Sequence, residues 1–116
     1  MIFSVNDHIQ QIINGTKTQT RRVYHPEDSR EYKVGKTYSI QPARTKPGIS
    51  EGRIKVTRVW GEMYGFQISK DNAMAEGGYT PSEYEDLFRK IHRNWSFRQC
   101  IEFEFVPICT QEAKRK

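Results

Sequence analysis

One short segment of the chain gathers residue types that bind anions or act as nucleophiles. The segment from Gly15 to Arg22, GTKTQTRR, holds three cationic side chains and three hydroxyls within eight residues. Lys and Arg donate charge-assisted hydrogen bonds to anions, and a Thr hydroxyl offers short polar contacts or a nucleophile. The segment follows the apolar pair Ile12-Ile13, with only Asn14 between them. We therefore interpret it as the floor of a site for a phosphorylated or nucleic-acid ligand.

The size and charge of the chain limit the class of protein. Its 116 residues fit one compact domain, which we expect over residues 1–107, with a basic tail at 108–116 that is predicted to be disordered. The net charge of +5 favours polyanionic partners such as RNA, although a generic basic protein would have the same balance. No apolar run approaches the roughly 20 residues of a membrane span, and no signal peptide is recognisable. We expect a cytoplasmic protein without membrane contact.

The cysteines and histidines do not form a metal-binding pattern. Cys100 and Cys109 are the only cysteines, and their spacing is not that of a zinc site. Reduced thiols are expected, with Cys100 packed in a strand. His8, His25 and His92 are scattered, and we interpret each as a surface or boundary residue. No metal or other cofactor is therefore predicted.

Hydrophobic periodicity places the segment between a short helix and a strand. Ile9, Ile12 and Ile13 recur at helical spacing after a capping residue, Asn6 or Asp7, and the helix should end at Gly15. Strands are predicted over residues 18–23, 36–41, 52–60 and 96–106, with weaker alternation over 2–5. Two further helices are predicted, one from about residue 69 to Gly77-Gly78 and one from residue 80. This pattern predicts an α+β fold, a small β-barrel with two or three flanking short helices.

The helix from residue 80 carries the clearest signals. Thr80-Pro81-Ser82-Glu83 reads as a capping box with Pro at the first helical position. Its acidic residues lie at the start and its basic residues at the end, which complements the helix dipole. Apolar residues at helical spacing form a stripe along one face: Tyr84, Leu87, Phe88 and Ile91. The charged residues are Glu83, Glu85, Asp86, Arg89, Lys90 and Arg93. We assign these charges a structural role and no part in function.

Several motifs recur together in one known family. The stretch IINGTKTQTRR, from Ile12 to Arg22, is followed by Val34-Gly35-Lys36, by the run from Ile54 to Val59 and by AMAEGG from Ala73 to Gly78; Phe88 and Trp95 follow. In this order and spacing, over about residues 1 to 106, the chain resembles the ASCH domain, a branch of the PUA-like superfamily. The resemblance implies a five- or six-stranded barrel with a cleft beside the first helix. It also implies binding of RNA or a nucleotide-like ligand there.

The resemblance extends to small N4-acetylcytidine amidohydrolases, in which Lys, Thr and Glu are catalytic. Aligned by motif, these residues fall on Lys17, Thr20 and Glu76, whereas Arg21-Arg22, the Glu-Gly-Gly sequence and a longer basic loop depart from that group. A Thr hydroxyl needs a base, and a Lys amine can serve if desolvation or neighbouring cations lower its pKa. Lys17 and Thr20 converge only if residues 15–18 form a turn, because their odd spacing would separate them in a strand. Lys17 and Glu76 could equally form a plain ion pair.

Binding without chemistry is the first functional hypothesis, with single-stranded RNA or a modified nucleoside as partner. Stacking on a base could involve Tyr24, Tyr79, Trp60 or Trp95, although Trp95 fits the core better. The predicted nucleic-acid ligands are Lys17, Thr18, Arg21, Arg22, Arg44, Lys46 and Tyr79. The alternatives are an amidohydrolase acting on N4-acetylcytidine-like nucleosides without a metal, a ribonuclease, and a protein-interaction module. The sequence leaves open whether the protein is an enzyme, and it predicts no oligomeric state.

Overall fold

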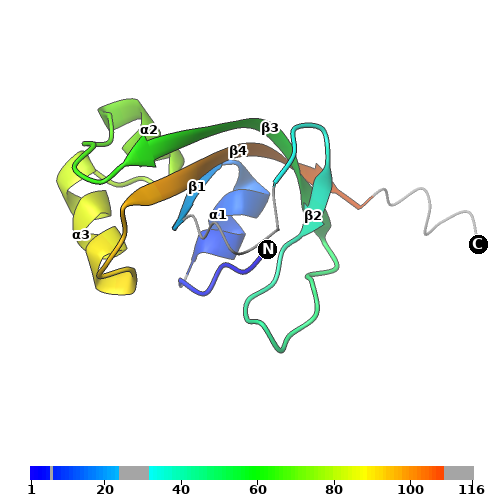
Figure 1. Cartoon of the computed structure of the whole chain (residues 1–116). Helices are drawn as coiled ribbons and strands as arrows, with labels where there is room; N and C mark the ends of the chain where they lie inside the picture. The colour runs from blue at the N-terminus through cyan, green and yellow to red at the C-terminus, as the bar shows by residue number, and fades with distance from the viewer. Residues whose placement is uncertain (6, 24–31, 109–116) are drawn as a thin grey trace, which may run out of the picture.

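A four-stranded antiparallel sheet arches over helix α1 (His8–Asn14) and forms a half-barrel (Figure 1). The strands are β1 (Gln19–Val23), β2 (Thr37–Ser39), β3 (Gly52–Met63) and β4 (Phe97–Pro107), in the order β1-β4-β3-β2. The computed structural model describes residues 1–5, 7–23 and 32–108. The predictions for Asn6, Tyr24, His25, Cys109 and the tail beyond residue 108 lie outside the described residues.

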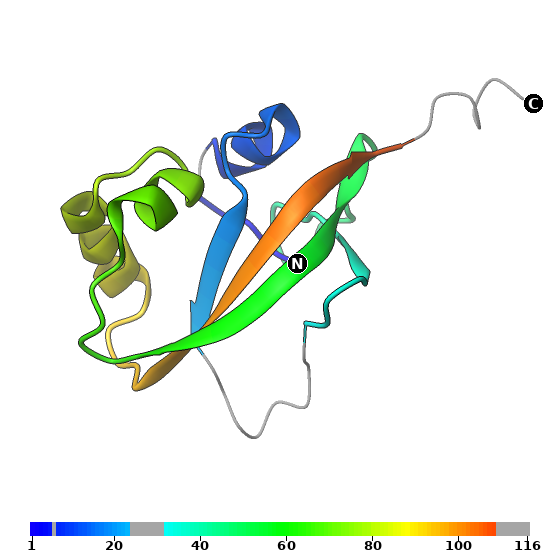
Figure 2. The same ribbon diagram turned by 90° about the horizontal axis from the view of Figure 1, so that it is seen from above.

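The two remaining helices lie together at one end of the sheet. Helix α2 (Lys70–Ala75) and helix α3 (Pro81–Ile91) sit at the end where β3 finishes and β4 begins, and β2 lies at the opposite end (Figures 1 and 2). Long pairing between β3 and β4, from Gly52↔Pro107 to Met63↔Phe97, connects the two ends. No helix among the described residues is long and apolar enough to cross a membrane.

The three predicted helices are present, and the predicted end of α1 and start of α3 are confirmed, whereas α2 ends at Ala75, before the predicted Gly77-Gly78. Gly15 ends α1 with φ 87°, and its N–H donates to Ile12 O, as expected of a residue that tolerates positive φ. The capping box at Thr80 is complete, because its side chain accepts from Glu83 N while the Glu83 side chain accepts from Thr80 N. At the start of α1, Asp7 is in a left-handed conformation and makes no side-chain cap hydrogen bond.

The strands differ from prediction mainly at their ends. Residues 2–5 form no strand; they contribute only a parallel bridge between Ile2 and Gln41. The segment predicted over 36–41 is reduced to three residues, whereas β3 continues three residues past Trp60. The described residues therefore contain four strands, rather than the five or six that the family resemblance implies.

Two apolar clusters hold the domain together. The larger lies under the sheet and against α1, and comprises Phe3, Ile12, Ile40, Ile54, Val56, Ile101 and Phe103. The smaller joins α2 and α3 to the end of the sheet, and comprises Ile68, Ala73, Tyr84 and Phe88. The region between these clusters has a different composition, because several charged side chains are buried there.

Candidate functional site

Lys17 enters the protein interior from a turn. Gly15 ends α1 and β1 does not begin until Gln19, so residues 15–18 lie outside both elements, as the sequence requires for convergence of Lys17 and Thr20. Two backbone hydrogen bonds fix this turn: Lys17 N–H donates to Gln11 O at 3.0 Å, and Thr18 N–H donates to Ala75 O at 2.8 Å. Lys17 is consequently only 2% exposed.

The Lys17 ammonium is surrounded by three oxygen acceptors. Nζ donates to the backbone oxygens of Gln19 and Glu76, each at 2.8 Å, and to Glu76 Oε1 at 3.2 Å. Burial lowers the pKa of Lys17 below its ordinary value of 10.5, the Glu76 carboxylate opposes this effect, and Arg22 and Arg21 reinforce it. The amine therefore loses its proton at a lower pH than an exposed lysine.

Glu76 lies between two cations. It follows the last residue of α2 and is 1% exposed. Its Oε1 accepts from Lys17, and its Oε2 accepts from the Arg21 guanidinium at 2.6 Å. The carboxylate is thus held from both sides, which compensates for its removal from water.

The charged cluster continues through the sheet to α3. Arg21 donates two hydrogen bonds of 2.9 Å to the two oxygens of Glu62. Glu62 Oε1 also accepts from Arg98 at 2.8 Å, and Arg98 donates to both oxygens of Glu85 at 3.0 and 2.9 Å. We call this set the ion network: Lys17, Glu76, Arg21, Glu62, Arg98 and Glu85. Three positive and three negative groups balance within it.

Thr20 lies on the opposite face of β1 from Arg21, because neighbouring strand residues alternate. It pairs with Ile101 of the larger core, whereas Arg21 pairs with Cys100. Thr20 is 6% exposed, and no hydrogen bond of its hydroxyl to another described residue is found.

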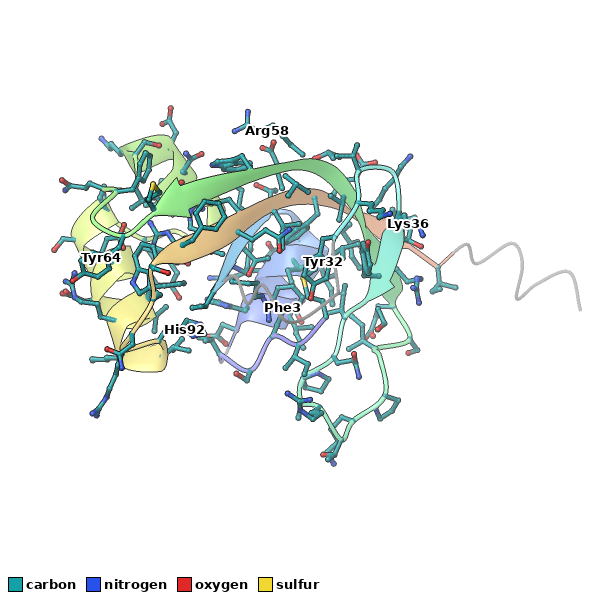
Figure 3. The ribbon with its side chains drawn as sticks, in the orientation of Figure 1. Phe3, Tyr32, Lys36, Arg58, Tyr64 and His92 are labelled. Carbon is teal, nitrogen blue, oxygen red and sulfur yellow. The ribbon has the colours of Figure 1, made fainter. Side chains whose placement is uncertain are left out.

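A cavity of about 200 Å³ brings the predicted catalytic residues together. Lys17, Thr20 and Glu76 all line it, with Arg21, Arg22 and His8. Its remaining walls are the N-terminal segment 2–5 and one side of α3, including Leu87, Phe88 and Ile91. Figure 3 shows two of the lining residues, Phe3 under the sheet beside α1 and His92 at the end of α3.

The other predicted ligands divide into two groups. Arg22 lines the cavity, donates to Ile2 O and lies over the Phe3 ring at 5.0 Å. Tyr79 does not line the cavity itself, but its hydroxyl lies 2.7 Å from Nε2 of His8, which does.

Thr18, Arg44 and Lys46 do not line the cavity. Thr18 is tied through its backbone to Ala75 and Phe103, and Arg44 and Lys46 are exposed in the loop between β2 and β3. Arg21 lines the cavity, but its guanidinium is already engaged by Gln19, Glu62 and Glu76. Thr18, Arg44 and Lys46 therefore do not meet Lys17 and Arg22 at the cavity, and Arg21 meets them with its guanidinium already bound.

Three residues of the site were missed by sequence reasoning. Glu62 and Arg98 are 3% and 0% exposed and pair across β3 and β4, but the predicted strand stopped at Trp60. Glu85 was assigned to the helix dipole, although it binds Arg98 and also accepts from Ile68 N. The available signal was the alternation of β4, which places Arg98 on the same face as the buried Cys100.

His8 was interpreted as a boundary residue, but it is 7% exposed and lines the cavity. Burial, followed by the charge of Lys17, lowers its pKa from 6.5 to about 4. Because the unfolded chain then binds a proton more readily between these values, stability should fall as pH drops from 6.5 to about 4. We expect His8→Gln to remove about 2–3 kcal/mol of this pH dependence. Urea denaturation of both proteins at pH 7 and pH 4.5 measures it; identical pH dependence would contradict the assignment.

Comparison with solved structures identifies the fold. An ASCH domain from Lactobacillus crispatus matches with a TM-score of 0.72 and 19% identity, over 89% of this chain and 72% of that chain. An Enterococcus faecalis protein of the DUF984 family matches with a TM-score of 0.62 and 24% identity, over 87% of this chain and 71% of that chain. The chain has the ASCH-domain fold. No family model and no curated protein matches the sequence.

The ASCH fold agrees with the predicted α+β small barrel with flanking short helices. At these identities the likeness concerns architecture alone, so the roles of the site residues must be argued from their own geometry. Within the part of the chain that is described, no three His, Cys, Asp or Glu side chains are grouped as metal ligands would be.

Proposed function

We propose that this ASCH-fold protein hydrolyses the amide of an acylated nucleoside of the N4-acetylcytidine type. Thr20 is the nucleophile, Lys17 its general base, and Glu76 the group that orients Lys17. The observation that carries the proposal is the convergence of these three side chains on one cavity, with Lys17 buried and its pKa lowered. Covalent catalysis needs a nucleophile and a group able to accept its proton in the same site, and one cavity holds both here.

The contacts of Lys17 support a role as a base. A neutral amine has two N–H donors and one lone pair, and the two backbone oxygens at 2.8 Å would satisfy both donors. The lone pair then takes the direction of the longest contact, that to Glu76 Oε1 at 3.2 Å. Acceptance of the Thr20 proton therefore requires Nζ to turn from this contact toward Thr20 when substrate is bound.

The proposed reaction proceeds in two balanced steps. Lys17 accepts the Thr20 hydroxyl proton while Oγ1 bonds to the acyl carbon; the bond from that carbon to the exocyclic nitrogen then breaks, and Lys17 returns the proton to the nitrogen. The free nucleoside leaves an ester on Thr20. A water molecule attacks the ester, Lys17 again accepts and returns a proton, and the carboxylic acid departs with Thr20 restored.

The size and walls of the cavity favour part of a nucleoside over a polymer. Its volume of about 200 Å³ is below the roughly 300–1,000 Å³ of pockets for drug-sized ligands. Apolar side chains from α3 and the N-terminal segment face the polar residues across it. A planar base or a short acyl group suits such a site better than a phosphate backbone does.

The deciding experiment is incubation of the purified protein with N4-acetylcytidine and, separately, a short RNA ladder, with products resolved by chromatography. We expect equimolar cytidine and acetate, also in the presence of EDTA. Shortened RNA would support the ribonuclease alternative. Intact acetylcytidine at high enzyme concentration would reject the amidohydrolase proposal.

The pH dependence of the reaction follows from the state of Lys17. Because the amine must be neutral to accept the Thr20 proton, kcat/KM should rise with pH and reach a plateau above the pKa of Lys17. Since burial lowers that pKa, the midpoint should lie below 10.5. Initial rates between pH 5 and pH 10 measure it, and a rate that falls over this range would contradict the role of Lys17.

Binding of RNA or a nucleotide without hydrolysis is the second proposal. It is favoured by the net charge of +5 and by the position of Arg22 on the cavity wall. Its signature is salt-sensitive binding of single-stranded RNA that Arg22→Ala weakens, with no product released.

A further inference from the structure

The ion network gives the proposed active site a support that the resemblance to amidohydrolases does not include. Arg21 is one of the two arginines by which this chain departs from that group. Its guanidinium reaches Glu76 Oε2 at 2.6 Å, while Lys17 occupies the other oxygen of the same carboxylate. Arg21 therefore acts on Lys17 through Glu76.

Glu62 fixes the orientation of Arg21. The two 2.9 Å hydrogen bonds, from Nε and one terminal nitrogen, form the bidentate geometry that restrains a guanidinium most strongly. Gln19 Oε1 accepts from the remaining terminal nitrogen at 3.0 Å. Arg21 is 3% exposed, so water does not compete for these contacts.

We propose that Arg21 is a positioning residue that keeps the Glu76 carboxylate aligned with Lys17, and that Glu62 holds Arg21 in place for this purpose. When Lys17 is neutral, Glu76 loses one of its two cationic partners. Arg21 still pairs with the carboxylate at 2.6 Å and keeps it in position for Lys17. This inference rests on the proposed function for its catalytic meaning, but its electrostatic part can be tested separately.

The inference predicts that two substitutions shift the pKa of Lys17 in opposite directions. Arg21 lowers the pKa of Lys17, although less than burial does, so loss of its charge should raise that pKa. Loss of the Glu62 charge leaves Arg21 less neutralised and should lower it. Neither substitution changes the other ionisable residues that face this pair. They are His8 of α1, Arg22 of β1, Tyr79, and Tyr84 of α3.

The test is a pH titration of the Lys17 Cε resonance by NMR, together with kcat and KM, in Arg21→Gln, Glu62→Gln and Arg21→Lys. We expect the Lys17 midpoint to rise by about one pH unit in Arg21→Gln and to fall in Glu62→Gln. Arg21→Lys keeps the positive charge but loses the bidentate guanidinium contact. The Lys17 midpoint should therefore stay near that of wild type, while kcat falls about tenfold or more. Arg58→Gln, at an exposed arginine paired with Glu102 at 3.8 Å, is the matched control.

Each outcome decides one part of the inference. Midpoints that do not move, or that move in the same direction in Arg21→Gln and Glu62→Gln, overturn the electrostatic role. An unchanged kcat in Arg21→Lys overturns the positioning role, and this conservative variant remains informative if the others do not fold. If the midpoints move as expected but wild type hydrolyses no acylated nucleoside, the proposed function fails and the coupling of Arg21 to Lys17 stands.

Discussion

Thr20→Val is expected to abolish hydrolysis of N4-acetylcytidine, with a loss of at least about 1,000-fold in kcat. Valine has the shape of threonine, so it can occupy the buried position on β1 without a new void. It lacks the hydroxyl of Thr20, a residue that lines the cavity and whose hydroxyl bonds to no other described residue. The loss should therefore come from missing chemistry, with the fold intact.

Two further variants make this expectation specific. Thr20→Ser retains a hydroxyl and should keep activity within about tenfold of wild type. Thr16→Val removes a hydroxyl from the same segment at an exposed position and should leave kcat unchanged. Mass spectrometry of the protein mixed rapidly with substrate should detect one acetyl group on wild type and none on Thr20→Val. Wild-type turnover by Thr20→Val would remove Thr20 from the mechanism.

Arg98→Met is expected to destabilise the protein by about 3–5 kcal/mol, the usual effect of removing one partner from a buried ion pair. Arg98 is fully buried and binds both Glu62 and Glu85, so its loss leaves Glu85 without its cation and Glu62 with only Arg21. Its guanidinium also lies 4.8 Å from the ring centroids of Phe88 and Trp95. Since small domains are stable by about 5–15 kcal/mol, this loss is severe.

Arg89→Met is the matched control, because Arg89 binds Asp86 at 2.6 Å on the exposed side of α3. An exposed pair contributes at most about 1 kcal/mol, so this variant should unfold close to wild type. Urea denaturation followed by circular dichroism measures both. Equal unfolding midpoints for Arg98→Met and wild type would show that the ion network does not stabilise the domain.

Elements with strong local signals could be predicted from the sequence. The capping box at Thr80 and the glycine after α1 specify helix ends through contacts within a few residues, and both predictions were confirmed. The extent of β2 and β3 could not be predicted in this way, because it depends on which partner strand is available. Residues 2–5 alternate like a strand, but only Ile2 finds a partner, at Gln41.

The site was predictable where the motif is local and hidden where charges meet across the sheet. The turn that directs Lys17 inward could be predicted, because Gly15 ends the preceding helix. Glu76 was identified only through the family resemblance. Glu62 and Arg98 are 36 residues apart in the chain and meet because β3 and β4 pair in one register. Composition suggests that such residues are exposed, and burial became possible only because each found a partner of opposite charge.

The pairing of β1 with β4 also determines when the cavity can exist during synthesis. Within the described sheet β1 hydrogen-bonds only to β4, and their register joins Gln19 to Glu102. A nascent chain that ends before β4 therefore has no neighbour for the strand that carries Thr20 and Arg21, and no Arg98 for Glu62. Closing so long a loop is slow. The ribosome must release nearly the whole domain before the cavity can form.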